Sequence, residues 1–251
     1  MSSVLKEVAG TLGYETDSYK TPEGGTLTFV FFAHASLAVG YRTGEAQYAV
    51  YVDPVSAYAD YGAFPAADVV FVTHEHSDHF DPAAVRALLK ADTAIVCNRE
   101  VERLLGDVTD SGGHPVRVVA LSEGGVFDAA PWLSARAVAA YNTTAGRDRF
   151  HPRGRDNGYV LTLGGTHVYV AGDTEPTPEM KALKDVDIAF LPVNQPYTMT
   201  VAQAVEAARW LRPAVLYPCH YGEVPDVTPV GRIAELLSDQ PETQVLVRRM
   251  E

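Results

Sequence analysis

The sequence contains only two cysteines in 251 residues, Cys97 and Cys219. Two are too few for a disulfide framework, and they form no C-x-x-C zinc motif, which fits a reducing compartment. Both lie in apolar stretches, so we expect them to be small buried residues. No stretch approaches the ~18 apolar residues of a membrane span, and the N-terminus lacks the apolar core of a signal peptide. With Met1 as the natural start, these absences predict a soluble cytoplasmic protein that does not enter a membrane.

Positive charge is also scarce. Lysine and arginine number 20 against 32 aspartates and glutamates, which gives a formal net charge of -12. A broad attraction for nucleic acid is therefore not expected, and an anionic substrate must be bound by local positive groups, metal ions included. The remaining composition, 47% hydrophobic and 21% charged, is typical of a globular protein with a sizeable core.

Apolar, β-branched runs predict two sets of strands with helices between them. The first set is 26–32, 36–41, 46–53, 68–73 and 94–97, and the second is 116–121, 134–141, 158–163, 167–171, 187–192 and 214–218. Capping residues predict helices that begin after Asp81, Thr177, Thr200 and Thr228. Two strand-rich halves with peripheral helices predict two sheets packed face to face under helices, in one domain over residues 1–251.

The stretch THEHSDH, residues 73–79, is the densest group of metal-binding side chains in the sequence. It lies between a buried strand and a helix start, and such loops usually carry the chemistry of α/β proteins. His74 and His76 are two residues apart, so in extended backbone both imidazoles can hold one ion from the same side, while Asp78 and His79 can reach a second. This is not the helical H-E-x-x-H spacing of zinc proteases. The alternative is a solvated polar turn, which the density of histidines disfavours.

Two more ligand candidates lie at the ends of later apolar strands. The stretch THVYVAGDTE delivers Asp173 into a loop before a helix, and PAVLYPCHYGE delivers His220. A carboxylate and a histidine are what a two-metal site needs to complete its ligands. Taken alone, Asp173 could be a capping or turn aspartate and His220 a histidine bonded to backbone. Their combination with residues 73–79 favours a metal site.

These stretches carry a resemblance to a known family. HEHSDH matches the H-x-H-x-D-H signature of the metallo-β-lactamase fold, and AGDT and PCHYGE resemble its later metal motifs. FFAHASLAV, VDP, YVAGDTE and VLYPCHYG look like one branch, the ascorbate-6-phosphate lactonase-like metal-dependent hydrolases, over about residues 26–223. The resemblance implies an α/β, four-layer αββα sandwich (metallo-β-lactamase fold), whose members often assemble, so a homo-oligomer stays open.

The resemblance also implies roles for six residues. His74 and His76 would bind the first metal, Asp78, His79 and His220 the second, and Asp173 would bridge them. One or two divalent ions are expected, with zinc favoured by the imidazoles and manganese or iron left possible by the carboxylates. The metals would activate a water near neutral pH, and Asp78 would orient that water or pass on its proton.

The sequence departs from the family pattern at Asn142. A histidine that binds the first metal usually follows a strand like LSARAVAAYN, and a neutral amide is a far weaker zinc ligand than imidazole. His151, in the next loop, is the expected substitute and a catalytic residue with Asp78, and His114 is a weaker candidate. The alternative for both histidines is a solvent-exposed loop position.

The substrate is expected to be a small anionic molecule. Four arginines lie between residues 147 and 155, and Arg147 and Arg153 are candidates to bind a phosphate or carboxylate, unless the loop is solvated and partly neutralised. His34 and Tyr197 are further candidates for contact with the metal ligands or the substrate. The resemblance favours hydrolysis of a lactone or other cyclic ester. The alternatives are a phosphodiesterase of the same fold, or a metal-binding or ligand-sensing protein without turnover.

Overall fold

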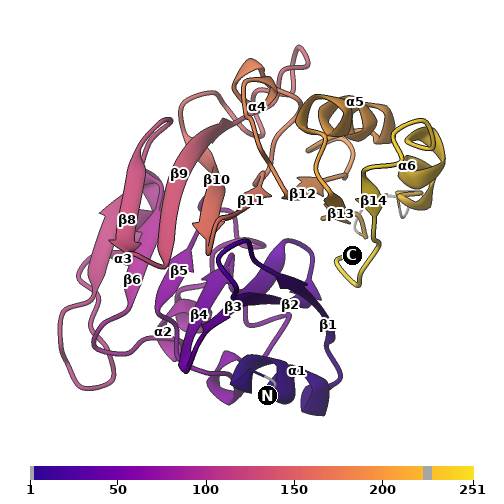
Figure 1. The fold of residues 1–251 in the computed structure, drawn as a ribbon. Coiled ribbons are helices and arrows are strands. Elements are labelled where there is room, and N and C mark those ends of the chain that lie inside the picture. The colour runs from indigo at the N-terminus through magenta and orange to yellow at the C-terminus, as the bar shows by residue number, and fades with distance from the viewer. Residues whose placement is uncertain (1–2, 223–227) are drawn as a thin grey trace. The chain divides into compact units, whose positions relative to one another are not determined.

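The computed structural model describes residues 3–222 and 228–251, and of Ala129 and Ala130 only the backbone. The chain divides into two compact units: residues 1–121 with 163–165, and residues 122–162 with 166–251. Met1, on which the expectation about the chain's start depends, lies outside the described residues. Figure 1 colours the first unit from indigo to magenta and the second from pink to yellow.

The first unit contains a seven-stranded mixed sheet in sequence order, β1-β2-β3-β4-β5-β6-β7. The strands are β1 (Glu15–Lys20), β2 (Thr26–Ala33), β3 (Ser36–Thr43), β4 (Ala46–Val52), β5 (Val69–Phe71), β6 (Ala94–Cys97) and β7 (Arg117–Ala120). Strands β1 to β4 pair antiparallel and β4 to β7 pair parallel. In the parallel half, the carboxyl ends of β4 and β5 reach the same edge of the sheet, which brings the residues after them together.

Helices cover the first sheet. They are α1 (Val4–Leu12), the 3-10 helix η1 (Tyr61–Ala63), α2 (Pro82–Ala87) and α3 (Arg99–Leu105). Alternate strand residues such as Val70 and Val72 join Val85 of α2 and Val101 of α3 in one apolar core. This core fixes β5 and α2, and therefore the two ends of the loop between them.

The second unit contains another seven-stranded mixed sheet, in the order β14-β13-β12-β11-β10-β9-β8. The strands are β8 (Val126–Ala130), β9 (Leu133–Ala140), β10 (Asp156–Leu163), β11 (Thr166–Val170), β12 (Ile188–Pro192), β13 (Val215–Cys219) and β14 (Gln244–Val245). Strands β11 to β14 are parallel, and β8 pairs antiparallel with β9. The carboxyl ends of β11, β12 and β13 therefore share one edge.

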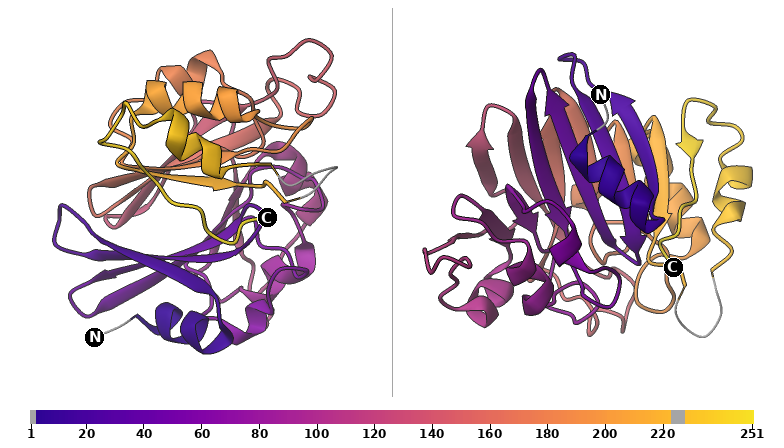
Figure 2. Two further views of the ribbon diagram at one scale, coloured as in Figure 1. Left: turned by 90° about the vertical axis from the view of Figure 1, so that its right-hand side faces the viewer. Right: turned by 90° about the horizontal axis from the view of Figure 1, so that it is seen from below.

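Three helices, α4 (Pro178–Lys181), α5 (Val201–Leu211) and α6 (Gly231–Leu236), lie on one face of the second sheet (Figures 1 and 2). The predicted caps of two are present: Thr177 accepts from Met180 N, and Thr200 forms a capping box with Gln203. The expected start of α6 at Thr228 was wrong. That helix begins at Gly231 after Val230, and no side chain caps it, so Thr228 does not act as its N-cap.

All eleven predicted strands are present, and the α/β class with two helix-flanked sheets is confirmed. The assignment of 116–121 to the second set was wrong, because this strand is β7 and pairs with β6 in the first sheet. The sequence interpretation missed α1, β1, α3, β8 and β14. Strand β1, ETDSYK, is an edge strand with no buried residue, so it shows no apolar pattern. Within the described residues, no helix is both long and apolar enough to cross a membrane.

Among the described residues, five other than glycine have positive φ angles, and three of these carry site side chains. They are His34 at 58°, Asp53 at 46° and His220 at 54°. Each directly follows a strand, at β2, β4 and β13 respectively. Left-handed backbone is costly for residues with a Cβ, and such strain tends to occur at functional sites.

Candidate metal centre

The first unit gathers a set of polar side chains at the ends of β2, β4 and β5, which we call the first cluster. Its members are His34, Asp53, Thr73, His74, His76, Asp78 and His79. Most of them are buried, and His34, Asp53, Thr73, His74 and His79 have no exposed surface. Buried imidazoles and carboxylates need partners, so their arrangement has to be specific.

The loop from β5 to α2 brings the predicted histidine pair together. The backbone N–H of His79 donates to the carbonyl of His76 at 2.9 Å, which turns the chain, and Asp81 caps α2 by accepting from Ala83 N at 2.8 Å. His74 Nε2 then lies 3.0 Å from His76 Nδ1. Two nitrogens bound to one tetrahedral zinc ion are about 3.3 Å apart, so this pair is close to the spacing of a shared ion.

Asp53 holds the first cluster from behind and was not singled out from the sequence. Its Oδ2 lies 2.8 Å from His79 Nδ1 and accepts from Thr73 Oγ1 at 2.7 Å, while Oδ1 accepts from Thr73 N at 2.7 Å. A carboxylate on Nδ1 leaves Nε2 of His79 for an ion and fixes the ring, which is the usual arrangement behind a metal-bound histidine. An aspartate before proline at a strand end, VDP, was the available signal.

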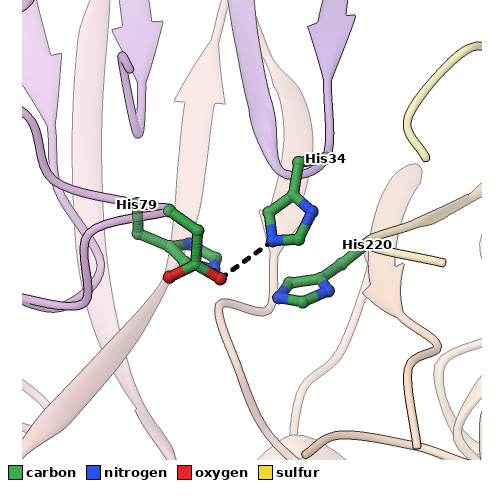
Figure 3. A group of neighbouring side chains, drawn as sticks. His34, His79 and His220 are labelled. Carbon is green, nitrogen blue, oxygen red and sulfur yellow. Dashed lines mark hydrogen bonds and ion pairs between the residues drawn. The ribbon is translucent and has the colours of Figure 1, made fainter. Parts of the chain in front are cut away.

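His34 contacts the acidic member of the cluster. Its Nε2 lies 3.0 Å from Asp78 Oδ2, drawn as the dashed line in Figure 3, and its ring stacks on Tyr58 with centroids 5.7 Å apart. The potential ligand atoms of His34, Asp78 and His79 all lie within 4.8 Å of one another. His34 is therefore placed to orient Asp78.

The second unit gathers a second cluster at the ends of its strands. Its members are Asn142 after β9, His151 before β10, Asp173 after β11, Asn194 after β12 and His220 after β13. Each of these five residues has no more than 4% of its surface exposed. Asp173 and His220 lie where the sequence predicted, at the carboxyl ends of parallel strands.

Two imidazoles converge on one carboxylate oxygen in the second cluster. His151 Nε2 and His220 Nε2 each lie 3.3 Å from Asp173 Oδ2. Figure 3 shows the His220 side chain. A charge-assisted hydrogen bond would be about 2.7–2.9 Å, whereas a nitrogen and an oxygen on one tetrahedral zinc are about 3.4 Å apart. The spacing and donor chemistry therefore fit a divalent ion.

His151, the expected substitute ligand, is buried, which argues against the alternative of a solvent-exposed loop position. His151 is 1% exposed, and its Nδ1 lies 2.9 Å from Asn142 Oδ1. Asn142 thus contacts His151 instead of taking the usual histidine's place, while Asn194 lies 3.1 Å from His220 Nδ1. His114 lies in the first unit with its side chain 69% exposed, 3.1 Å from Asp110 in its own turn. Among the residues that the structure describes, His114 belongs to no group of potential metal ligands.

Glu175 fixes the loop that leads to His151. Its buried carboxylate accepts from the backbone N–H groups of Thr143 and Thr144, the first at 2.7 Å, and pairs with Arg147 at 3.1 Å. Burial by itself raises the pKa of Glu175, but these hydrogen bonds outweigh it and lower the pKa overall. An ionised Glu175 therefore fastens residues 143–147 to the end of β11.

The predicted substrate arginines are engaged elsewhere. Arg147 pairs with Glu175 and Arg153 with Glu179 at 2.6 Å, because two glutamates from the segment after β11 lie under the loop. Arg149 differs from both. Its guanidinium lies 4.8 Å above the Phe150 ring, which in turn packs on Tyr197 at 4.9 Å. In the described part of the chain, Arg149 has no carboxylate partner and is exposed.

Comparison with models of protein families identifies the family of this chain. Residues 28–220 match the model of the beta-lactamase superfamily domain. The chain belongs to this family. The α/β metallo-β-lactamase fold predicted from the sequence is thereby confirmed, and a hydrolase with a metal-binding centre is the corresponding class.

Sequence relatives identify a more specific family within this superfamily. The chain is 35% identical over 166 residues to a UPF0173 metal-dependent hydrolase of Salinibacter ruber, spanning 64% of this chain and 69% of that protein. It is 31% identical over 168 residues to another from Thermus thermophilus, spanning 66% and 70%. The chain is thus a member of the UPF0173 metal-dependent hydrolase family. None of these names specifies a lactone substrate.

Solved structures share the fold. One from Parabacteroides distasonis, provisionally described as a metal-dependent hydrolase, is 47% identical, with a TM-score of 0.85 over 95% of this chain and 100% of that one. A metallo hydrolase from Ignicoccus hospitalis is 22% identical, with a TM-score of 0.70 over 90% and 96%. The second likeness concerns the fold alone.

Proposed function

We propose that the chain is a hydrolase that uses a metal-activated water, with ligands for one or two divalent ions supplied by the first and second clusters. The ligands are His74, His76, Asp78, His79, Asp173 and His220, and His151 joins them in place of the histidine that Asn142 replaces. The observation that carries the proposal is the convergence of two buried imidazoles on Asp173 Oδ2 at 3.3 Å. Zinc suits these ligands best, and manganese or iron is compatible with the carboxylates.

The chain's own groups prepare the reaction. A divalent ion held by these residues would supply a water of lowered pKa and would polarise the bond under attack. Asp78, steadied by His34 at 3.0 Å, is placed to orient the water and to accept its proton. Asp53 keeps the His79 ring in one orientation through its Nδ1.

We propose a small anionic ester as the substrate, with a lactone or other cyclic ester favoured. Arg149 supports an anionic substrate. Among the described residues of this loop it is the arginine without a carboxylate partner, and its guanidinium stacks on the Phe150 ring. It lies two residues before His151 in the sequence. A guanidinium on an aromatic ring remains free to bind a carboxylate or phosphate by its edge. The preference for a lactone rests on the branch resemblance. We propose a cytoplasmic location because Cys97 and Cys219 are buried and form no disulfide.

Metal content tests the centre. Protein purified without added metal should contain about two ions per chain by elemental analysis, and His151→Ala should lose about one of them. His114→Ala is the matched control, because that histidine is exposed and bonded only in its own turn, and it should change nothing. A wild-type chain that holds almost no metal, even after incubation with zinc, would contradict the hydrolase proposal. It would favour a ligand-sensing protein that catalyses no reaction.

Substrate class is tested on the loaded protein. A lactone that carries a carboxylate should be hydrolysed faster than its neutral analogue and than a simple phosphodiester. Arg149→Ala should raise KM for the anionic lactone about tenfold or more, as for loss of a charge-assisted hydrogen bond, and leave the neutral one unchanged. Arg103→Ala, on exposed α3, is the charge-matched control. A preference for the diester would replace the lactonase by a phosphodiesterase.

A further inference from the structure

The Asn142 side chain makes two contacts that fix which way its amide points. Its Nδ2 donates to the Tyr197 carbonyl oxygen at 2.7 Å, and its Oδ1 faces His151 Nδ1 at 2.9 Å. A carbonyl oxygen only accepts hydrogen bonds, so the NH2 group has to face Tyr197. The amide oxygen is therefore the atom presented to His151.

This orientation decides which nitrogen of His151 carries the proton. Two acceptors lie beside Nδ1, Asn142 Oδ1 at 2.9 Å and the Tyr197 carbonyl oxygen at 3.2 Å. Nδ1 therefore carries the hydrogen in the neutral ring, and Nε2 keeps its lone pair. Nε2 lies 3.3 Å from Asp173 Oδ2, beyond the ~2.7–2.9 Å of a charge-assisted hydrogen bond, so the closer acceptor at Nδ1 holds the hydrogen. Because His151 is 1% exposed, water cannot substitute for either acceptor.

We propose that Asn142 is a positioning residue that holds His151 as the Nδ1–H tautomer and so makes its Nε2 available to a divalent ion. The inference rests on the proposed metal centre and assigns a role to the residue that breaks the family pattern. The proposed ligand, His151, lies nine positions after Asn142. The position where the family usually has a ligand histidine therefore holds the amide that orients His151. Asparagine suits this position because it accepts from the ring and donates to the carbonyl at once.

The backbone of Asn142 allows the side chain to be tested alone. Its backbone N–H donates to the His151 carbonyl at 2.9 Å, which closes the loop independently of the amide. Asn142→Leu removes both side-chain hydrogen bonds and keeps this closure. Asn142→Asp keeps an acceptor for Nδ1 and loses the donor to Tyr197. The backbone closure is common to both variants, so the difference between them reports on the acceptor that Asn142 offers to His151.

The first measurement is the tautomer of His151 in the metal-free protein, by long-range proton–nitrogen NMR with histidine labelled in 15N. The His151 signals are assigned by their loss in His151→Ala. Wild type and Asn142→Asp should show the Nδ1–H form, and Asn142→Leu a mixture of both tautomers. Zinc affinity by calorimetry should fall about 10- to 100-fold in Asn142→Leu and far less in Asn142→Asp, as for removal of a group that orients a ligand.

The outcomes separate the two proposals. An Nε2–H form in the wild type, or a leucine variant with unchanged tautomer and zinc affinity, would overturn the role of Asn142. A wild-type protein that binds no ion, but whose tautomer depends on Asn142, would overturn the metal centre and support the positioning. If Asn142→Leu does not fold, Asn142→Ala gives the same comparison without an added branched side chain.

Discussion

Replacing Glu175 by glutamine is expected to loosen the loop that leads to His151. The wild-type carboxylate has no exposed surface and accepts from Thr143 N at 2.7 Å and Thr143 Oγ1 at 3.2 Å, with further bonds from Thr144 and Arg147. Glutamine has nearly the same shape but offers one acceptor oxygen and an NH2 group. That NH2 group must then face a backbone N–H or the guanidinium, and donor faces donor.

The cost follows from these contacts. A hydrogen bond to a charged group contributes about 1.5–3 kcal/mol against 0.5–1.5 for a neutral pair, and a donor left unsatisfied in the interior adds to the loss. Arg147 is 27% exposed, so water partly satisfies it after the change. We therefore expect Glu175→Gln to lower the free energy of unfolding by about 2–4 kcal/mol, below the upper range for a broken buried pair.

Urea unfolding and zinc calorimetry check this expectation together. Glu100→Gln is the control, because Glu100 pairs with Arg103 on the exposed face of α3 and its loss should cost no more than about 0.5 kcal/mol. Zinc affinity should fall about tenfold in Glu175→Gln, since His151 loses its anchored loop. If both glutamine variants unfold alike and bind zinc alike, the loop is held by something other than Glu175.

Two further predictions concern the first cluster and pH. Asp53→Asn should weaken zinc binding about 10- to 100-fold by calorimetry, because an amide orients His79 and Thr73 less strongly than a carboxylate does. Asparagine tolerates the φ of 46° at this position, so the variant adds no backbone strain. An unchanged zinc affinity would contradict the role of Asp53. Burial raises the pKa of Glu179, but its hydrogen bonds, including those with Tyr141 and Arg153, lower it below the usual 4.5 overall. Its contribution to stability is therefore full above about pH 4.5 and is lost as the pH falls through the lowered pKa. Urea unfolding between about pH 3 and 7 should show a shallower acid loss in Glu179→Gln than in wild type, and parallel curves would contradict this.

Much of the fold could be predicted because apolar runs and caps are local signals. The buried strands β5, β11 and β13 are β-branched and apolar, and the residues after them, His74, Asp173 and His220, follow from the strand ends alone. Strand β1 could not be found in this way, since a half-exposed edge strand needs no apolar side chains. Helix α6 shows the limit of cap motifs, because threonine and proline precede it without capping it.

The groups that support the ligands were harder to predict than the ligands themselves. Asp53 lies 26 residues from His79 in sequence, and Glu175 lies 28 residues from Arg147, so only the folded sheets show that they pair. Separation along the sequence also hid the partners of Arg147 and Arg153. They were expected to bind substrate, but they pair with Glu175 and Glu179, which belong to another segment. Asn142 was visible as a departure from a pattern, but its partner had to be seen in three dimensions.

At His34, Asp53 and His220, the left-handed backbone lowers the stability of the fold for any residue with a Cβ, while the clusters need these three side chains. Glycine adopts φ angles of 46–58° without the crowding that a Cβ meets, so backbone stability alone would choose glycine there. A population selected only for resistance to heat should therefore drift toward glycine at these sites and lose the cluster side chains with it. The chain keeps side chains at all three, which is expected where the cluster side chains serve more than folding.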